Sequence, residues 1–359
     1  LFTKETAIII PVIMAGYMLV IKRISWKRLI LPSAGWAVCI GIWMGIRSGA
    51  TLAANYINLP DMISAGLSRL GVIIQYLGKI FLPVNLTVFP EYQDISLVWG
   101  FISLGLFAGL IIYSKSYLKP LTYLGLFWFL IFLLPVLIVP KNLNDQVFEH
   151  RLYLPIVGIL LMLSQTVPFN NGVNARQKIV IAIPLIIIFA VVSIFRTAYF
   201  NDPLTFWTKA VEGSPRSAYA HTLLGTKVEN PDEREALFRK AYALDPDLKN
   251  LNFYLGKVLL EKKQPDSARL LLHKEVRKNP IPDAWFLLAQ IAFERNMIDS
   301  AAIYLEKVIE LYPKHPQANH NLVLLYWQNG MKDKARKTLD TMRNNGVEPG
   351  QELMDMMRN

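Results

Sequence analysis

Six apolar segments dominate the first 200 residues, and each is close to the length of about 20 residues that a helix needs to cross a bilayer. They cover residues 6–21, 29–46, 95–113, 121–139, 152–167 and 179–195. Hydrophobic residues make up 53% of the chain, which is high for a soluble protein. The pattern therefore predicts an integral membrane protein with about six helical spans.

Segment 63–82 lies between the second and third of these runs and carries a polar stripe. Ser64, Ser68, Gln75 and Lys79 stand at offsets of 0, 4, 11 and 15 residues, which places them on one narrow face of a helix. Such a helix suits the membrane interface or the wall of a wet cavity better than a lipid-facing crossing. We therefore predict one interfacial or re-entrant helix in addition to the spans.

Charged residues alternate in sign between successive loops of the membrane region. Loops 22–28, 114–119 and 168–178 contain basic residues and no acid. If segment 63–82 does not cross, all six acids of the first 200 residues fall in the opposite loops: Glu5, Asp61, Glu91, Asp94, Asp145 and Glu149. The positive-inside rule then predicts that the region after residue 195 is non-cytoplasmic, at a bacterial inner membrane or, in a eukaryote, the endoplasmic reticulum. Membrane insertion alone also places acidic residues in non-cytoplasmic loops, so their position does not by itself indicate a functional site.

The remaining residues repeat a helical pattern with a period of 33 or 34 residues. Ala268, Ala301 and Ala335 take equivalent positions, where a close helix crossing needs a small residue. The copy beginning DAWFLLAQ matches the tetratricopeptide (TPR) pattern at further positions: Trp285, Leu288, Ala289, Leu305, Val308 and Pro313. A shorter, degenerate copy contains Leu224, Gly225, Phe238, Ala241 and Pro246. We predict a solenoid of about four TPRs whose concave face binds extended protein or peptide segments.

The predicted fold class is therefore all-α, a polytopic transmembrane helix bundle followed by a TPR α-solenoid. We expect a membrane domain at 1–200 that is truncated at its N terminus, a TPR domain at 201–349 and a C-terminal tail at 350–359. The single cysteine, Cys39, excludes an intrachain disulfide.

The positive net charge of +11 belongs mostly to the membrane region. The first 200 residues hold 15 of the 38 basic residues and 6 of the 27 acidic ones, so that the rest carries 23 basic and 21 acidic residues. A nearly neutral solenoid offers no polyanion-binding surface, and we predict no nucleic-acid partner. Membrane lipid and a protein or peptide segment are the expected partners.

Four motifs in fixed order resemble one known family. LFTKETAIIIPV opens the chain, FLPVNLTVFPEYQ ends the polar-striped helix, EHRLYLP opens a span and FWTKAVEGSP leads into the repeats. This order resembles the C-terminal part of the membrane O-mannosyltransferase-like family, in which a GT-C domain precedes TPRs. The resemblance implies transfer of a sugar from a polyprenyl-phosphate carrier to a protein hydroxyl outside the cytoplasm. The family's name points to mannose as that sugar. It also implies a catalytic carboxylate upstream of Leu1.

The stretch FEHRLYLP, residues 148–155, would contribute to the donor site. We select Arg151 as the first candidate for the donor phosphate, because an Arg fork matches phosphate oxygens, and Lys4 as a second cation. Glu149 and Glu91 would orient a cation or a sugar hydroxyl, and His150 would shuttle a proton or lie at the interface. The competing interpretation is that these charges only anchor the end of a span.

Two further charged residues complete the candidate set. Glu5 and Arg47 lie on the same predicted face, and Glu5 is expected to pair with Lys4 or Arg47 rather than to catalyse. The sequence contains no His/Cys metal-ligand spacing, phosphate-cradling Gly loop or nucleophile elbow. It specifies no bound cofactor, leaves a divalent metal open, and implies a lipid-linked sugar as donor substrate.

The sequence is also compatible with two other functional classes. A non-catalytic, membrane-anchored TPR scaffold explains the soluble half equally well, but does not require polar residues in several separate external loops. An O-antigen-ligase-like enzyme is also multispanning and can carry TPRs, although the long external loop of that class is missing from this sequence.

Overall fold

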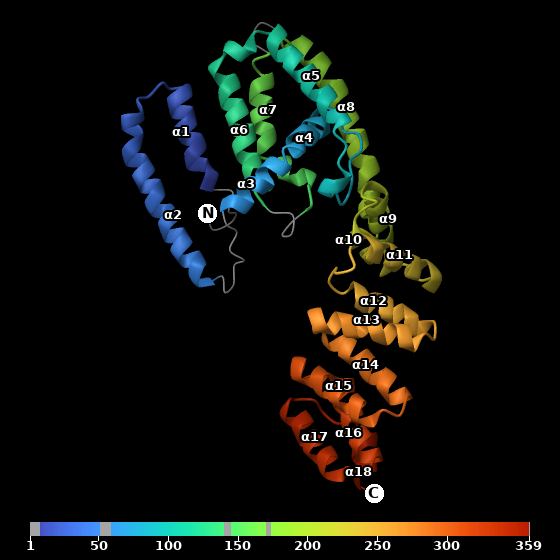
Figure 1. The fold of residues 1–359 in the computed structure, drawn as a ribbon. Helices are drawn as coiled ribbons and strands as arrows, with labels where there is room; N and C mark the ends of the chain where they lie inside the picture. Colours follow the sequence, from blue (N-terminus) through green and yellow to red (C-terminus); the bar gives the residue numbers. More distant parts are fainter. Residues whose placement is uncertain (1–7, 51–58, 140–144, 170–173, 359) are drawn as a thin grey trace. The chain divides into compact units, whose positions relative to one another are not determined.

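The computed structural model describes residues 8–50, 59–139, 145–169 and 174–358, without the side chains of 47–50, 352 and 358. Within this part every regular element is a helix, and strand-like pairing is limited to one antiparallel bridge between Glu91 and Gln146. The chain forms two compact units, Leu1–Pro215 and Arg216–Asn359 (Figure 1). The predicted all-α fold class is confirmed.

The first unit is built from helices α1 to α9. Their bounds are α1 (Ile10–Val20), α2 (Ile30–Ala50), α3 (Leu59–Ser68), α4 (Gly71–Phe81), α5 (Val98–Tyr113), α6 (Pro120–Leu137), α7 (Pro155–Leu163), α8 (Ala175–Thr197) and α9 (Pro203–Gly213). The short 3-10 helices η5 (Glu149–Leu152) and η6 (Ala198–Phe200) precede α7 and α9.

Glycines let two pairs of helices in this unit pack with their backbones in contact. A Cβ atom added to Gly125 on α6 would lie 2.5 Å from the carbonyl oxygen of Gly158 on α7. One added to Gly78 on α4 would lie 2.8 Å from the backbone nitrogen of Gly100 on α5. Such small-residue crossings are typical of helix packing in membranes, where close van der Waals contact drives association.

In the described part of the chain, three helices are long and apolar enough to cross a membrane, fewer than the six predicted: Trp26–Ile46, Pro120–Leu137 and Ala175–Phe200. The predicted spans 6–21, 95–113 and 152–167 contain helices α1, α5 and α7 of 11, 16 and 9 residues. At 1.5 Å per residue these are about 16, 24 and 14 Å long, against a hydrocarbon core of about 30 Å. The apolar run 152–167 is shortened because its helix begins only at Pro155 and ends at Leu163.

The predicted polar-striped helix 63–82 is instead two helices, because the chain turns at Arg69 and Leu70. The Arg69 side chain is only 1% exposed and its Nη2 lies 3.4 Å from Asp145 Oδ1. The four stripe residues are thus divided between the helices, Ser64 and Ser68 on α3, Gln75 and Lys79 on α4.

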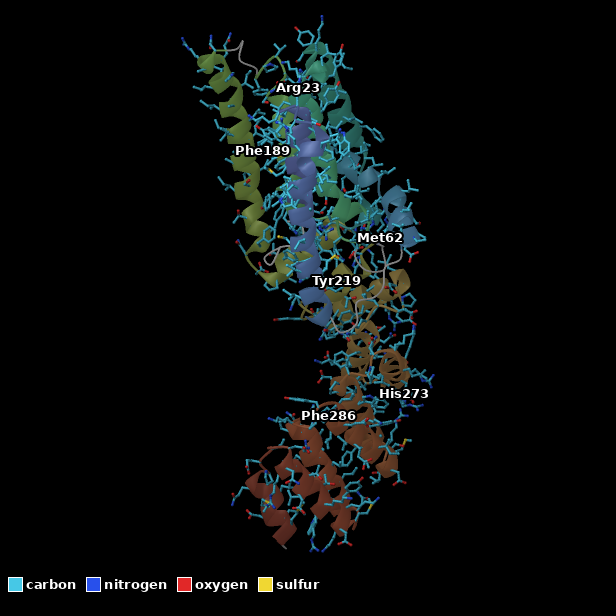
Figure 2. The ribbon with its side chains drawn as sticks, turned by 90° about the vertical axis from the view of Figure 1, so that its left-hand side faces the viewer. Arg23, Met62, Phe189, Tyr219, His273 and Phe286 are labelled. Atoms are coloured by element: carbon cyan, nitrogen blue, oxygen red, sulfur yellow. The ribbon has the colours of Figure 1, made fainter. Side chains whose placement is uncertain are left out.

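The predicted basic loops lie at one end of the first unit, where α1 meets α2, α5 meets α6, and α7 leads to α8 (Figure 1). Two of these connections touch, since Lys119 Nζ donates to the Gln165 carbonyl at 2.7 Å and the Val167 N–H to Ser114 Oγ at 2.9 Å. Arg23, in the first loop, lies at this end and Met62 on α3 lies toward the other (Figure 2). The unit therefore has a basic end and an acid-bearing end.

The second unit is a stack of helix pairs, as the repeat pattern predicts (Figure 1). The pairs are α10 (Ala218–Gly225) with α11 (Pro231–Leu244), α12 (Leu251–Glu261) with α13 (Pro265–Lys278), α14 (Pro282–Glu294) with α15 (Ile298–Leu311), and α16 (Pro316–Gln328) with α17 (Lys332–Asn344). Helix α18 (Gln351–Arg358) follows, and its Leu353 is buried in the last hydrophobic cluster.

The small residues of the repeat lie where the pattern requires them. Ala268, Ala301 and Ala335 are 0%, 1% and 0% exposed, each on the second helix of its pair. Pro280 and Pro313 stand two residues after the ends of α13 and α15, where proline cannot continue a helix. The helical register of the repeats is therefore confirmed.

Helix α9 and the first residues after it group with the first unit, so the boundary between the compact units follows Pro215. The degenerate copy begins the second unit, where α10 is only eight residues long and the ring of Phe238 fills the space beside Gly225. The predicted functional domain limits at 200/201 and 349/350 stay predictions.

Candidate functional site

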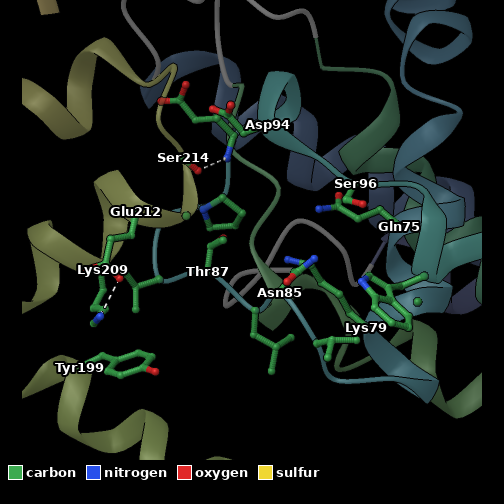
Figure 3. A pocket seen from close by; sticks show the side chains of 18 residues that line it. Gln75, Lys79, Asn85, Thr87, Asp94, Ser96, Tyr199, Lys209, Glu212 and Ser214 are labelled. Carbon is green, nitrogen blue, oxygen red and sulfur yellow. Dashed lines mark hydrogen bonds and ion pairs between the residues drawn. The ribbon is translucent and has the colours of Figure 1, made fainter. Parts of the chain in front are cut away.

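A polar pocket of about 370 Å³ opens in the first unit (Figure 3). Its wall comes from helix α4, from residues 84–99 that follow it, and from residues 199–214, which are distant from both in sequence. Its lining includes seven amide, hydroxyl and aromatic side chains, Gln75, Asn85, Thr87, Ser96, Trp99, Tyr199 and Ser214, beside charged and aliphatic ones. A pocket of this size and chemistry suits a small polar ligand.

Lys79 brings a nearly buried charge to this pocket. Its side chain is 6% exposed, and its Nζ donates to Glu149 Oε1 at 2.5 Å. Helix α4, which carries Lys79, is too short to count among the helices of spanning length. Burial lowers the pKa of the Lys79 ammonium below its ordinary value, and the nearby Glu149 carboxylate offsets part of this shift. A buried ion pair of this kind costs desolvation energy, and it is weak support for stability alone.

Two oxygen atoms in the pocket wall lack a hydrogen-bond partner among the residues that the structure describes. Gln75 is 7% exposed, and its buried Oε1 accepts no hydrogen bond. The buried Oγ1 of Thr87 likewise has no partner. An unpaired buried polar atom costs about 1–3 kcal/mol, so a donor supplied by a ligand or water would stabilise this wall.

The pocket also contains a second, more exposed ion pair. Lys209 Nζ donates to Glu212 Oε2 at 2.6 Å on α9. With Lys79 bound to Glu149, the two cations of the lining each have a carboxylate partner. The uncharged amides and hydroxyls are therefore the groups most available to a ligand.

Two of the predicted external loops are joined by backbone hydrogen bonds. The Tyr92 N–H donates to the Asp145 carbonyl at 3.0 Å, and the Val147 N–H to that of Pro90 at 2.9 Å. Glu91, 7% exposed, lines the pocket, and its N–H donates to Ser214 Oγ at 3.3 Å. Backbone hydrogen bonds thus hold the loop of Glu91 against the stretch that leads to Glu149.

The three ionisable groups of FEHRLYLP lie on or beside η5 with different surroundings. Glu149 reaches the pocket through Lys79. Arg151 is half-buried, donates from Nη1 to the Gln146 carbonyl at 2.7 Å, and does not line the pocket. His150 is exposed, and its ring stacks on Phe148 with centroids 5.3 Å apart.

The other predicted residues are not placed by the structure. Lys4 and Glu5 lie outside the described residues. Arg47 belongs to α2, but its side chain lies outside the description. Among the described residues no group of three or more His, Cys, Asp or Glu side chains is arranged to hold a metal ion.

Sequence reasoning missed the pair formed by Arg69 and Asp145, which ties the turn between α3 and α4 to the stretch before η5. Tyr76 adds a second tie, since its hydroxyl donates to the Phe148 carbonyl at 3.1 Å. An arginine inside an apolar run was the available signal for a buried ion pair, because such a charge needs a partner.

The second unit has a pocket of its own, of about 360 Å³, between α14, α15 and α16. Its lining is mostly apolar and includes Phe286, Phe293, Leu305 and Leu324. Helices α14 and α16 are the first helices of successive pairs.

The family models that match this chain match residues of the second unit. Residues 253–316 and 292–351 each match a tetratricopeptide repeat family model. The curated proteins contain no match to the chain.

Three solved structures are similar over part of the chain. The crystal structure of MamA is 20% identical, with 40% of this chain and 86% of that chain covered and a TM-score of 0.37. YrrB, described as a TPR protein with an unusual peptide-binding site, is 26% identical over 43% and 81% of the chains, with a TM-score of 0.36. The pilF protein of Pseudomonas aeruginosa is 21% identical over 46% and 84%, with a TM-score of 0.38. On the family matches, residues 253–351 are tetratricopeptide repeats, a module that binds proteins or peptides.

Proposed function

We propose that this chain is a membrane-embedded, glycosyltransferase-like protein. Its first unit binds a polyprenyl-phosphate sugar at the acid-bearing end, on the non-cytoplasmic side. Its repeats recruit the protein acceptor or a partner. The observation that carries this proposal is the polar pocket, with a nearly buried Lys79 and an unpaired Gln75 amide oxygen in the wall of an otherwise apolar helix unit.

The exposed apolar surface of the first unit supports insertion in a membrane. Helix α8 buries none of its residues, and side chains such as Ile186 and Phe195 are 64% and 71% exposed. Exposed apolar area of this extent is rare on soluble monomers, and a lipid environment accounts for it.

The two ends of the unit support the proposed orientation. The acid-free basic loops gather at one end, and the positive-inside rule assigns such loops to the cytoplasm. The chain leaves α8 at the opposite end and continues into α9, whose residues line the polar pocket. The pocket and the repeats are then on the non-cytoplasmic side.

The chemistry of the pocket matches the donor in two parts. Hydroxyl and amide groups beside Trp99 suit the hydroxyls and apolar face of a sugar. Lys79 is the less exposed of the two cations that line the pocket, and its partner Glu149 lies two residues before Arg151 on η5. We assign donor-phosphate binding to Lys79 in the pocket and, from outside its lining, to Arg151, and the orientation of the donor to Glu91 and Glu149.

Donor binding by purified full-length variants tests the proposal. Synthetic polyprenyl-phosphate mannose and the same lipid phosphate without sugar are titrated against the Lys79→Gln and Gln75→Met variants. Arg176→Gln, which removes an exposed cation from the first turn of α8 at the basic end, is the matched control.

The loss of a charge-assisted hydrogen bond, worth about 1.5–3 kcal/mol, predicts that Lys79→Gln weakens both ligands about 10- to 150-fold. Gln75→Met should weaken only the sugar-bearing lipid, because the amide oxygen has no role toward the phosphate. Equal affinities for the wild type, Lys79→Gln and Arg176→Gln would contradict the proposed site.

A non-catalytic TPR scaffold anchored by the first unit is the second candidate. The repeat match at residues 253–351 favours it, because that match alone accounts for protein binding. A scaffold needs no ligand in the polar pocket, so the donor titration separates the two candidates.

A further inference from the structure

A row of residues on the first helices of the repeats recurs from one pair to the next. On α14, Phe286, Gln290 and Phe293 stand at offsets of 0, 4 and 7 residues and so share one face of the helix. The residues 33 positions earlier on α12 are Phe253, Lys257 and Leu260, and those 34 positions later on α16 are His320, Leu324 and Trp327. We call these nine residues the groove face, and Lys257 is its one Lys or Arg.

The pocket of the second unit lies on this face. Phe286 (Figure 2), Phe293 and Leu324 line it together with the buried Ala289 and Leu305. Phe293 is 51% exposed, although it lines this mostly apolar pocket. Large aromatic side chains around a cavity of this kind are the usual anchors of protein interfaces.

The charges around the pocket limit what can enter it. Of the described residues that line it, Glu294 alone is charged at neutral pH, and Gln290 and Asn321 add uncharged amides. An acidic segment or a C-terminal carboxylate would meet no cation there, and would be repelled by Glu294. The amides can bind the backbone of an extended chain.

Basic residues of the second unit gather on a different helix. Helix α13, the second of its pair, holds a cluster of five such residues: Arg269, His273, Lys274, Arg277 and Lys278. The groove face and this basic cluster are therefore chemically distinct surfaces.

We infer that the groove face binds an extended, non-acidic segment of a partner protein, which inserts an aromatic or branched aliphatic side chain between Phe286 and Phe293 and places a basic residue near Glu294. The inference deepens the recruiting role assigned to the repeats in the proposed function. It names the chemistry of the recruited segment.

Three fluorescein-labelled peptides on one Gly-Ser scaffold test it by fluorescence anisotropy with the full-length chain. Their central residues are Leu-Phe-Arg, Ser-Ser-Arg and Leu-Phe-Glu. We expect the first to bind, the serine peptide to bind at least about tenfold more weakly, and the glutamate peptide to bind several-fold more weakly.

Variants place the binding on the groove face. Phe293→Ala should weaken the Leu-Phe-Arg peptide at least about tenfold. Ile303→Ala, on an α15 residue that is 54% exposed and does not line the pocket, should leave its affinity unchanged. Glu294→Lys should reverse the preference between the arginine and glutamate peptides.

Three outcomes would overturn the inference: binding of the serine peptide as tight as the first, no effect of Phe293→Ala, or no binding of any peptide by the folded chain. Donor titration on the same preparations separates the two proposals. Lipid-phosphate sugar binding that persists while the peptides fail would refute the groove chemistry and leave the donor site standing.

Discussion

Ala268→Leu should destabilise the repeat unit by about 1–3 kcal/mol through overpacking. Ala268 is fully buried on α13, where α12 crosses closely. At the same crossing, a Cβ atom added to Gly256 would lie 3.0 Å from Leu272 Cγ and 3.5 Å from the Ala268 carbonyl oxygen. The helices therefore leave no room for three more carbon atoms at position 268.

Hydrogen exchange of the α13 amides, followed by mass spectrometry in the full-length chain, measures this loss. A decrease of 1–3 kcal/mol in the free energy of opening corresponds to exchange about 5- to 150-fold faster. Ser267→Leu adds the same side chain at an exposed neighbouring position and should change stability by no more than about 0.5 kcal/mol. Equal exchange in the two variants would refute the assigned repeat register.

Two further predictions concern packing in the first unit and pH in the second. Gly158→Val should separate α6 from α7 and lower the unfolding temperature, because an added Cβ atom meets the Gly125 carbonyl oxygen. Gly109→Val, which has open space at its Cβ position, should be tolerated. Thermal unfolding of the two purified variants compares them, and equal midpoints would contradict this packing. Burial, followed by the nearby cations Arg269 and Arg277, lowers the pKa of His273 below its ordinary value near 6.5. The unfolded chain therefore binds more protons, so stability should fall as the pH drops through about 6.5. The His273→Gln variant should show a smaller fall in the α13 exchange assay, and an unchanged pH dependence would remove His273 as its cause.

The helical repeats could be predicted from sequence because their spacing is set by local requirements. Small residues at Ala268, Ala301 and Ala335 and prolines after the helices identify each pair without knowledge of distant contacts. The all-α class of the first unit followed from its apolar runs. The lengths of its helices did not follow, since an apolar run such as 152–167 does not reveal that its helix starts only at Pro155.

The polar pocket depends on contacts between residues far apart in sequence. The sequence made Glu149 a candidate because it precedes an apolar run, and it placed Lys79 only on a polar stripe. Nothing in either pattern pairs the two residues across 70 positions. The break at Arg69 likewise depends on Asp145, which lies in a different loop. Lining residues from α9 were missed because the sequence assigned that helix to the repeats.

Accessibility of single cysteines in intact cells tests most directly whether the pocket and the repeats share the non-cytoplasmic side of a membrane. In a Cys39→Ser background, cysteines replace the exposed residues Tyr117 in a basic-end loop, Ser96 in the pocket wall and Gln317 on α16. An impermeant thiol reagent should label the Ser96 and Gln317 variants and spare the Tyr117 variant until the membrane is permeabilised. Labelling of Tyr117 with protection of Ser96 and Gln317 would invert the orientation, and equal labelling of all three in intact cells would contradict membrane insertion.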